Sequence, residues 1–464
     1  MHSTSGRLRS LAVVCLAGSL VLLAAPVGAV TAPASAHARV STTEDPAPAV
    51  PASPAPPVLT ATSIQDSTAP MPSERGLRSA LGSLLRTPAL GRASVVIVDP
   101  GTNAVLLGRN AETPRIPAST IKLLTGVAAV RTLGPNTRLA TRVVRDGDTI
   151  ILVGGGDATL VSGSGGRGPL AGGSASLREL ARQTARAVGG GPVRLGFDDS
   201  LFTGPTLGPG WSRGFPSAGV VAPVTALMVD QGRRSKGSIA RVADPARQAA
   251  RIFAQYLEED GVRVQRVRRM KAPVNASEVA RVESPPVAEL VQRMLTESDN
   301  DLAESLAHLV GREAGTGASF AGGGAAVMAV IDDLGLPDDG LRIVDGSGLS
   351  QENKVASITL AGVLVGAARR SDSVFGPIAS GLPVAGETGT LADRFRGRGA
   401  AIARGNVRAK TGTLSSVVGL AGTVKDADGR VLVFAVLGNR VPSVEGARRT
   451  VDEIAVRLAE CGCS

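Results

Sequence analysis

The chain has 464 residues, of which 43% are hydrophobic and 19% are charged. This length and composition exclude a disordered chain and predict a globular protein with more than one domain. The formal net charge of +10 suits anionic surroundings such as a membrane surface or an acidic polymer. Nucleic acid is disfavoured as a partner, because only 2% of the residues are aromatic and no DNA-binding motif occurs.

The N-terminus has the features of a secretory signal peptide. Arg7 and Arg9 precede an apolar run over residues 11–25, and small-residue cleavage sites follow as far as Ala38. We therefore expect a signal peptide over 1–38 and an exported protein. An uncleaved membrane anchor is the alternative, which the short apolar run disfavours. Residues 39–72 are rich in Pro, Ala, Ser and Thr, which predicts a disordered linker.

Folded structure is predicted to begin near Ser73. Leucines at helical spacing over residues 77–85 predict a helix that ends before Pro88. The apolar runs 94–98 and 104–107 flank a turn sequence and predict a hairpin. A helix is predicted over 118–132.

The C-terminal part of the chain predicts a second hairpin and a last helix. The runs 417–424 and 431–437 flank Asp428-Gly429, and residues 444–459 carry an apolar helical face. Terminal helices and two separated hairpins predict an α/β (α+β) fold, with one antiparallel sheet flanked by helices.

The domain organisation follows from these elements. We expect a discontinuous domain over 73–140 and 275–464, and one or two smaller β-rich domains inserted over 141–274. The inserted region contains glycine clusters, the strand-like run 149–153 and the alternating run 262–268. The arginines of that last run are read as a solvated strand face in preference to a polymer-binding stripe.

Histidine and lysine are scarce in this arginine-rich chain. His308 is the only histidine beyond the leader and lies in a helical run with several leucines, so a surface or packing residue is expected. A serine–histidine–aspartate triad or a catalytic zinc site is therefore not easily built. A desolvated lysine can lose its proton and act as a base, which arginine cannot. The 50 basic residues include six lysines, at positions 122, 236, 271, 354, 410 and 425.

The first candidate motif is Ser119-Thr120-Ile121-Lys122. A spacing of three places Ser119 and Lys122 on one face of a helix. Ser119 then lies at the helix N-terminus, where backbone N–H groups favour a developing anion. A serine beside a neutral lysine is a nucleophile–base pair that needs no histidine. A serine N-cap is the structural alternative.

Two further motifs follow in the chain. Ser298-Asp299-Asn300 precedes a helical run, and a helix cap is its structural alternative. Lys410-Thr411-Gly412-Thr413 is expected to enter the first strand of the C-terminal hairpin, where an edge lysine is the alternative. In this order, the three motifs are the signature of the penicillin-recognising serine enzymes.

The chain resembles the low-molecular-mass class C penicillin-binding proteins, the D-alanyl-D-alanine carboxypeptidase/endopeptidase group. The resemblance covers roughly residues 77–458. It includes the glycine-rich segment 152–160, the segments around Trp211 and 222–227, and the segments 345–350 and 382–391. The long separation from Lys122 to Ser298 is distinctive, because this family fills it with extra domains.

The resemblance implies roles for the catalytic residues. Ser119 would attack the carbonyl of the penultimate D-Ala and form an acyl-enzyme, with Lys122 as general base. Ser298 would relay a proton to the leaving amine. Asn300 would hold the substrate backbone and Lys122. No metal or organic cofactor is required.

The third motif is implied to bind substrate. Lys410 would bind the terminal carboxylate with Thr411 and Thr413, within the Lys-Thr-Gly segment that includes Gly412. Its charge is also expected to depress the pKa of Lys122. The backbone N–H groups of Ser119 and Thr413 would form the oxyanion hole.

The implied substrates are peptidoglycan stem peptides that end in, or are cross-linked through, D-Ala, with β-lactams as covalent inhibitors. Peripheral association with the membrane or with anionic wall polymers would suit the positive charge. A β-lactamase is one alternative, although a Glu-x-x-Leu-Asn segment is missing and Tyr256 is not in a Tyr-x-Asn context. A catalytically silent wall-binding protein is the other, and the intact motifs argue against it.

Three remaining features receive no catalytic role. Gly163–Gly168 matches a nucleotide-binding pattern but is read as a loop. Residues 387–390 mimic the Lys-Thr-Gly motif with reversed charge and are expected to form a loop beside the site. Cys461 and Cys463 are assigned no function, since an intermolecular bridge is as plausible as a strained one between them.

Overall fold

The computed structural model describes residues 69–163, 173–369 and 373–463. The expected signal peptide and nearly all of the expected linker lie outside these ranges, as does most of Gly163–Gly168. Within the described ranges, no helix combines the length and apolar character that a membrane span requires.

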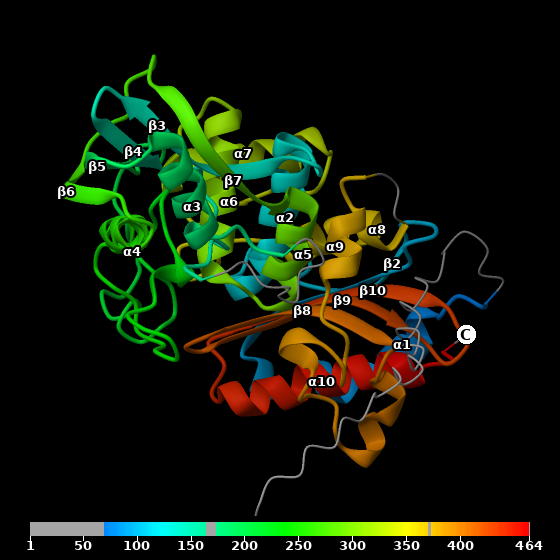
Figure 1. Cartoon of the computed structure of the whole chain (residues 1–464). Helices are drawn as coiled ribbons and strands as arrows, with labels where there is room; N and C mark the ends of the chain where they lie inside the picture. Colours follow the sequence, from blue (N-terminus) through cyan, green and yellow to red (C-terminus); the bar gives the residue numbers. More distant parts are fainter. Residues whose placement is uncertain (1–68, 164–172, 370–372, 464) are drawn as a thin grey trace, which may run out of the picture. The chain divides into compact units, whose positions relative to one another are not determined.

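The described elements follow one another as shown in Figure 1. The α-helices are α1 (Glu74–Arg86), α2 (Lys122–Leu133), α3 (Leu177–Val188), α4 (Pro245–Glu259), α5 (Val287–Thr296), α6 (Asn300–Glu313), α7 (Phe320–Asp333), α8 (Ser357–Arg369), α9 (Gly376–Gly381) and α10 (Val444–Glu460). The strands are β1 (Arg92–Val98), β2 (Val105–Arg109), β3 (Arg138–Asp146), β4 (Thr149–Val153), β5 (Pro192–Asp198), β6 (Arg263–Arg269), β7 (Ser277–Pro286), β8 (Val407–Leu414), β9 (Val417–Lys425) and β10 (Val431–Asn439). Short 3₁₀ turns are η2 (Pro88–Leu90), η3 (Ala118–Ile121), η4 (Asp230–Gly232), η5 (Gly389–Leu391) and η6 (Arg398–Ala403).

The first sheet combines the two ends of the described chain. Its strand order is β2-β1-β10-β9-β8, and all neighbours are antiparallel. β1 and β10 pair in the middle, with Ile97 opposite Phe434. Both predicted hairpins and both predicted terminal helices are therefore confirmed, and the expected antiparallel sheet flanked by helices is observed.

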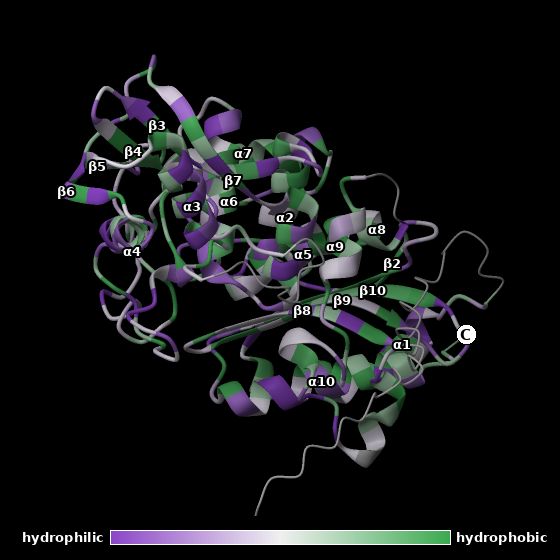
Figure 2. Ribbon diagram, viewed as in Figure 1, coloured by the Kyte–Doolittle hydropathy of each residue, from purple (hydrophilic) through white to green (hydrophobic). Residues whose placement is uncertain are grey.

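Both faces of this sheet are buried, because side chains along each strand alternate between them. Leu432, Phe434 and Val436 of β10 pack in the core with α1 and α10. The alternate residues Val433 and Leu437 pack in the core that contains α2, α5, α6 and α8. Figure 1 shows these two helical layers on opposite faces, and Figure 2 shows β10 coloured as hydrophobic between them.

The Lys-Thr-Gly motif lies on a strand that was not predicted separately. It was expected to enter the first strand of the C-terminal hairpin, but it belongs to β8, which pairs with β9 across a two-residue turn. Ser416 in this turn adopts φ +59, a left-handed conformation that lets the chain reverse between two tightly paired strands. Serine is only weakly typical of turns, so the sequence pattern did not separate β8 from β9.

A second sheet is built from the long segment between the first two motifs. Its strand order is β6-β5-β4-β3-β7, with β4, β5 and β6 parallel and the other pairs antiparallel. α3 and α4 pack on it around their own core, which includes Phe197 and Phe253. The sheet begins at Arg138 and ends at Pro286, so its first and last strands extend past residues 141 and 274 on either side. The arginines of β6 are exposed, as expected for a solvated strand face.

The core of the first sheet gives a stability prediction. Phe434→Ala should lower the free energy of unfolding by about 3–5 kcal/mol, because it leaves a cavity where a fully buried side chain filled the core. Val105→Ala in β2 is the control, since Val105 is 53% exposed and should change stability little. Urea denaturation of both variants measures the difference. Equal losses in the two variants would contradict the assignment of the core.

Candidate active site

Ser119 and Lys122 lie at the start of α2, where the chain enters the helical core. Residues 118–121 form the 3₁₀ turn η3, and the α-helix begins at Lys122. Ala118 adopts φ +48, so a residue with a side chain is held in a left-handed conformation directly before the serine. Ser119 is partly exposed, whereas Lys122 is fully buried. The serine is thus accessible and its neighbouring amine is not.

The amine of Lys122 has three oxygen partners from separate parts of the chain. Its Nζ lies 3.1 Å from the Oγ of Ser119, 2.7 Å from the Oδ1 of Asn300 and 2.6 Å from the backbone carbonyl of Ser347. The first motif and the second motif therefore meet at one nitrogen atom. The third partner was not predicted from the sequence.

Burial lowers the pKa of Lys122 to about 8. Four carboxylates oppose this shift, with Glu304 the largest contributor, followed by Asp345, Asp299 and Asp301. An amine with this pKa is unprotonated in a useful fraction of molecules near neutral pH, and can then accept a proton from a serine within hydrogen-bond distance.

The second motif lies at the N-terminus of α6. Asp299 caps the helix by accepting the backbone N–H of Leu302, which confirms the capping interpretation for that residue. Ser298 precedes it with φ +55, a strained conformation that redirects the chain before the helix. Asn300 accepts from Lys122 through Oδ1 and donates from Nδ2 to the carbonyl of Val220 at 2.9 Å.

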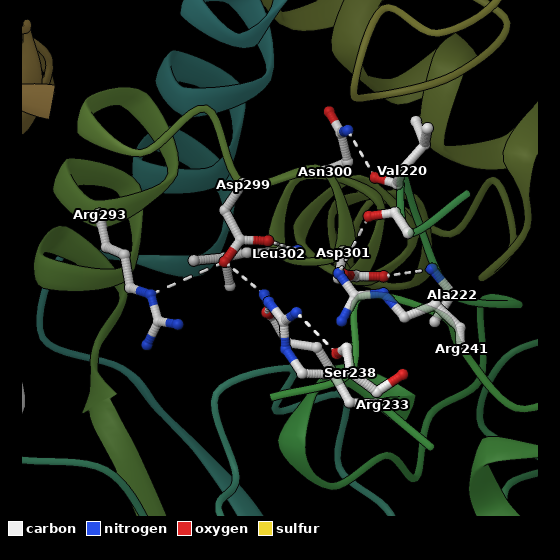
Figure 3. Close-up of polar contacts among 12 residues, drawn as sticks. Val220, Ala222, Arg233, Ser238, Arg241, Arg293, Asp299, Asn300, Asp301 and Leu302 are labelled. Atoms are coloured by element: carbon white, nitrogen blue, oxygen red, sulfur yellow. Dashed lines mark hydrogen bonds and ion pairs between the residues drawn. The ribbon is translucent and has the colours of Figure 1, made fainter. Parts of the chain in front are cut away.

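Asp299 is held by polar residues from two sides, as Figure 3 shows. Its Oδ2 accepts from the Nε2 of Gln231 at 2.7 Å, and the guanidinium of Arg293 lies 3.7 Å away. Gln231 belongs to the long segment between the first two motifs. That segment therefore contacts the second motif directly.

Asp301 makes a second connection to the same segment (Figure 3). One oxygen accepts the backbone N–H of Ala222 at 2.7 Å, and the other lies 3.3 Å from Nη2 of Arg241. Both charged side chains are buried. Burial raises the pKa of Asp301 to about 7, while Arg241 acts in the opposite direction.

Lys410, the charged residue of the third motif, is also fully buried. Its Nζ donates to the carbonyl of Thr411 at 3.1 Å. Burial, and then the charge of Lys122, hold the pKa of Lys410 well below its usual value. Repulsion between two amines acts on both, so the expectation that Lys410 depresses the pKa of Lys122 stays a prediction, and burial is the largest cause of the low pKa of Lys122.

Glycines bring the third motif against the first. A Cβ at Gly412 on β8 would lie 2.7 Å from the carbonyl of Pro117, and a Cβ at Gly348 would lie 2.0 Å from the carbonyl of Ala118. Gly348 also has φ +85, which only glycine adopts readily. The backbone around Ser119 is therefore enclosed by β8 on one side and by the loop 345–350 on the other.

Two other expectations about this region are confirmed. The loop 387–390 lies beside the site, since Thr390 accepts a hydrogen bond from Thr411 at 2.9 Å. His308 is buried among the rings of Phe202 and Phe320, and burial lowers its pKa to about 4. It is a packing residue.

The structure also joins Cys461 and Cys463 in a disulfide within the chain, at the C-terminal end of α10. The bridge lies near the start of α1, where the carbonyl of Cys463 accepts from the backbone N–H of Ser73. It is not part of the site.

Sequence reasoning missed the loop 345–350 as a structural partner of Lys122. Ser347 acts through its backbone carbonyl, which leaves no trace in the residue type. Glu304 acts on the same loop and lies four residues after Asn300 on the same face of α6. A glutamate between the apolar positions Leu302 and Leu306 was the available signal.

Comparison with known proteins places this geometry in a family. The profile of the D-Ala-D-Ala carboxypeptidase 3 (S13) family matches residues 77–238 and 233–461. The carboxypeptidase DacB of Mycolicibacterium smegmatis is 37% identical over 432 residues, which are 90% of this chain and 92% of that protein. A carboxypeptidase of Mycobacterium tuberculosis is 35% identical over 86% of each chain.

A solved structure shows the same fold. Penicillin binding protein 4 of Haemophilus influenzae superposes with a TM-score of 0.69 and 23% identity, over 84% of this chain and 98% of that one. It has also been solved in complex with a β-lactam. With the profile matching nearly all of the described residues, the chain belongs to the D-Ala-D-Ala carboxypeptidase 3 (S13) family, and is a class C penicillin-binding protein of low molecular mass.

Proposed function

We propose that this protein is an exported serine-type D-Ala-D-Ala carboxypeptidase and/or D,D-endopeptidase that cleaves peptidoglycan peptides through an acyl-enzyme on Ser119. The observation that carries the proposal is the buried amine of Lys122, 3.1 Å from the hydroxyl of Ser119 and in contact with Asn300. Membership of the family supports the reaction class, and the three motifs converge on one site.

Acylation begins with proton transfer from Ser119 to the neutral amine of Lys122. The serine oxygen then attacks the carbonyl carbon of the penultimate D-Ala. The C–N bond to the terminal residue breaks, and the proton that Lys122 took passes through Ser298 to the leaving amine, which leaves Lys122 neutral again. Water hydrolyses the ester and restores the serine. Atoms and charges balance without any added oxidant, reductant or metal.

The oxyanion that forms on the carbonyl needs donors in place. The backbone N–H groups of Ser119 and Thr413 are suited to this role, because the 3₁₀ turn η3 packs on β8. Removal of one such donor typically costs about 3 kcal/mol of transition-state stabilisation. Gly412 permits this packing, since a side chain there would meet the backbone of Pro117.

Lys410 would bind the substrate carboxylate together with the hydroxyls of Thr411 and Thr413. Its amine is buried and its pKa is held low in the free enzyme. An incoming carboxylate would favour the protonated form, because an opposite charge in a buried place raises the pKa of an amine. Lys410 would therefore recognise a substrate with a free carboxylate, or a β-lactam with the equivalent group.

The setting of the enzyme is part of the proposal. A signal peptide over 1–38 and a linker over 39–72 would place the folded part outside the cytoplasm, where stem peptides ending in or cross-linked through D-Ala occur. The positive net charge would suit association with the membrane or with anionic wall polymers.

We also infer that the peptidase domain comprises the first sheet with its helices, and that the inserted domain runs from β3 to β7.

Loss of the nucleophile tests the proposal. Wild-type protein should be labelled covalently by a fluorescent penicillin and should release D-Ala from a stem peptide ending in D-Ala-D-Ala. Ser119→Ala should lose both activities, because Ser119 supplies the hydroxyl that is hydrogen-bonded to the amine of Lys122. Gel fluorescence and mass spectrometry of the products measure the effect.

The control is Ser79→Ala on the exposed face of α1, which should behave as wild type. Equal labelling of Ser119→Ala and wild type would overturn the enzymatic proposal. No labelling of wild type would favour a catalytically silent wall-binding protein, and rapid hydrolysis of the penicilloyl adduct would favour a β-lactamase.

The pKa of Lys122 gives a pH prediction. Lys122 must be unprotonated to accept the proton of Ser119, so the acylation rate should rise with pH and reach half its maximum near pH 8. Stopped-flow measurement of acylation by a chromogenic β-lactam between pH 6 and pH 10 follows this rise. A rate that is constant or falls over that range would show that Lys122 is not the base.

A further inference from the structure

Glu304 is a buried carboxylate that the proposed mechanism does not use. It lies on α6, one helical turn after Asn300, and its side chain is fully buried. Its two oxygens accept the backbone N–H groups of Gly346 at 3.1 Å and Ser347 at 2.8 Å. A buried carboxylate is costly unless its oxygens are satisfied, and here they are used on one loop.

That loop holds the amine of Lys122. The carbonyl of Ser347 is 2.6 Å from Nζ, the shortest of the three contacts of the amine. Glu304 holds the peptide unit that enters Ser347 through its N–H, and the carbonyl of Ser347 shares the next planar unit with the N–H of Gly348. The hydroxyl of Thr125 secures the preceding residue through the carbonyl of Gly346 at 2.8 Å.

The other half of the loop is held by Asp345. One of its oxygens accepts the N–H of Gly348 at 2.8 Å, and the other accepts the indole N–H of Trp211 at 2.8 Å and the N–H of Ser350 at 2.6 Å. The loop is therefore fixed along its length. Glu304 anchors the backbone that enters Ser347, and Asp345 anchors the peptide unit that contains the Ser347 carbonyl.

Glu304 also acts on Lys122 through its charge. Among the groups that face the amine, Glu304 raises its pKa most, followed by Asp345, Asp299 and Asp301, and Lys410 is the facing cation. Around Glu304 itself lie Asp345 and Lys122. His308 contacts only its backbone carbonyl and is kept neutral by burial.

The protonation of Glu304 reflects opposing effects. Burial raises its pKa, and the charge of Asp345 adds to this, whereas the backbone N–H groups of Gly346 and Ser347 favour the carboxylate. The neighbouring ammonium of Lys122 favours the carboxylate as well. The charge of Glu304 thus favours the protonated form of Lys122, and the charge of Lys122 favours the ionised form of Glu304.

We propose that Glu304 is a positioning residue, which anchors the backbone N–H of Ser347 and so places the residue whose carbonyl holds Lys122, while its buried charge acts on that amine. The inference rests on the proposed function, because it assumes that Lys122 is the general base. It assigns to Glu304 two separable effects, one of geometry and one of charge.

Two substitutions separate these effects. Glu304→Gln removes the charge and one acceptor, so the pH midpoint of acylation should fall by about one pH unit and the plateau rate should fall by roughly tenfold. Glu304→Asp keeps the charge but withdraws the carboxylate from the loop, so the plateau rate should fall while the midpoint stays at the wild-type value. Both are measured by stopped-flow acylation with a chromogenic β-lactam between pH 6 and pH 10.

Glu313→Gln is the matched control. It makes the same chemical change on the same helix, but Glu313 is exposed at the far end of α6, about 13 Å along the helix axis. Its midpoint and plateau should equal those of wild type. Thermal unfolding of every variant verifies that the protein is folded.

A wild-type midpoint and plateau in folded Glu304→Gln would overturn the inference. If that variant does not fold, Glu304→Asp decides: a lower plateau with an unchanged midpoint supports the inference, and a wild-type plateau overturns it. Failure of the proposed function has a different result, since wild-type protein would then show no acylation or no rise with pH.

Discussion

The site depends on the burial of one amine. Lys122 is fully enclosed, yet its nitrogen contacts a hydroxyl, an amide oxygen and a backbone carbonyl that come from three separate segments. Burying an ammonium without partners would be very unfavourable, so these contacts and the carboxylates beyond them are what allow it. The same burial lowers the pKa of the amine to about 8, so that a fraction of it is neutral near neutral pH and able to accept a proton.

The segment between the first two motifs takes part in this arrangement. The carbonyl of Val220 binds the amide of Asn300, and the N–H of Ala222 binds Asp301. Arg241 from the same segment is buried against Asp301. The stretch that separates Lys122 from Ser298 along the chain therefore supplies the far side of the second motif, in addition to a sheet of its own.

Much of this could be predicted from sequence because it is local. A spacing of three residues places Ser119 near Lys122, and the apolar runs on either side of Asp428-Gly429 identify β9 and β10. The rest depends on contacts that residue types do not encode. The Ser347 carbonyl is a backbone group, and β8 was missed because the turn at Ser416 lacks glycine or asparagine. The low pKa of Lys122 could not be attributed to burial from the sequence, because burial is a property of the folded chain.

The pairing of β1 with β10 has a consequence for how the enzyme matures. Ile97 and Phe434 are neighbours in the sheet although more than three hundred residues separate them. β8, which carries Lys410, joins the sheet only through β9 and β10. Because the chain is made from its N-terminus, Ser119 is synthesised long before β8, the strand that packs beside it. A partly synthesised chain thus carries Ser119 without β8, and the arrangement around Lys122 can form only after the last strands have been made.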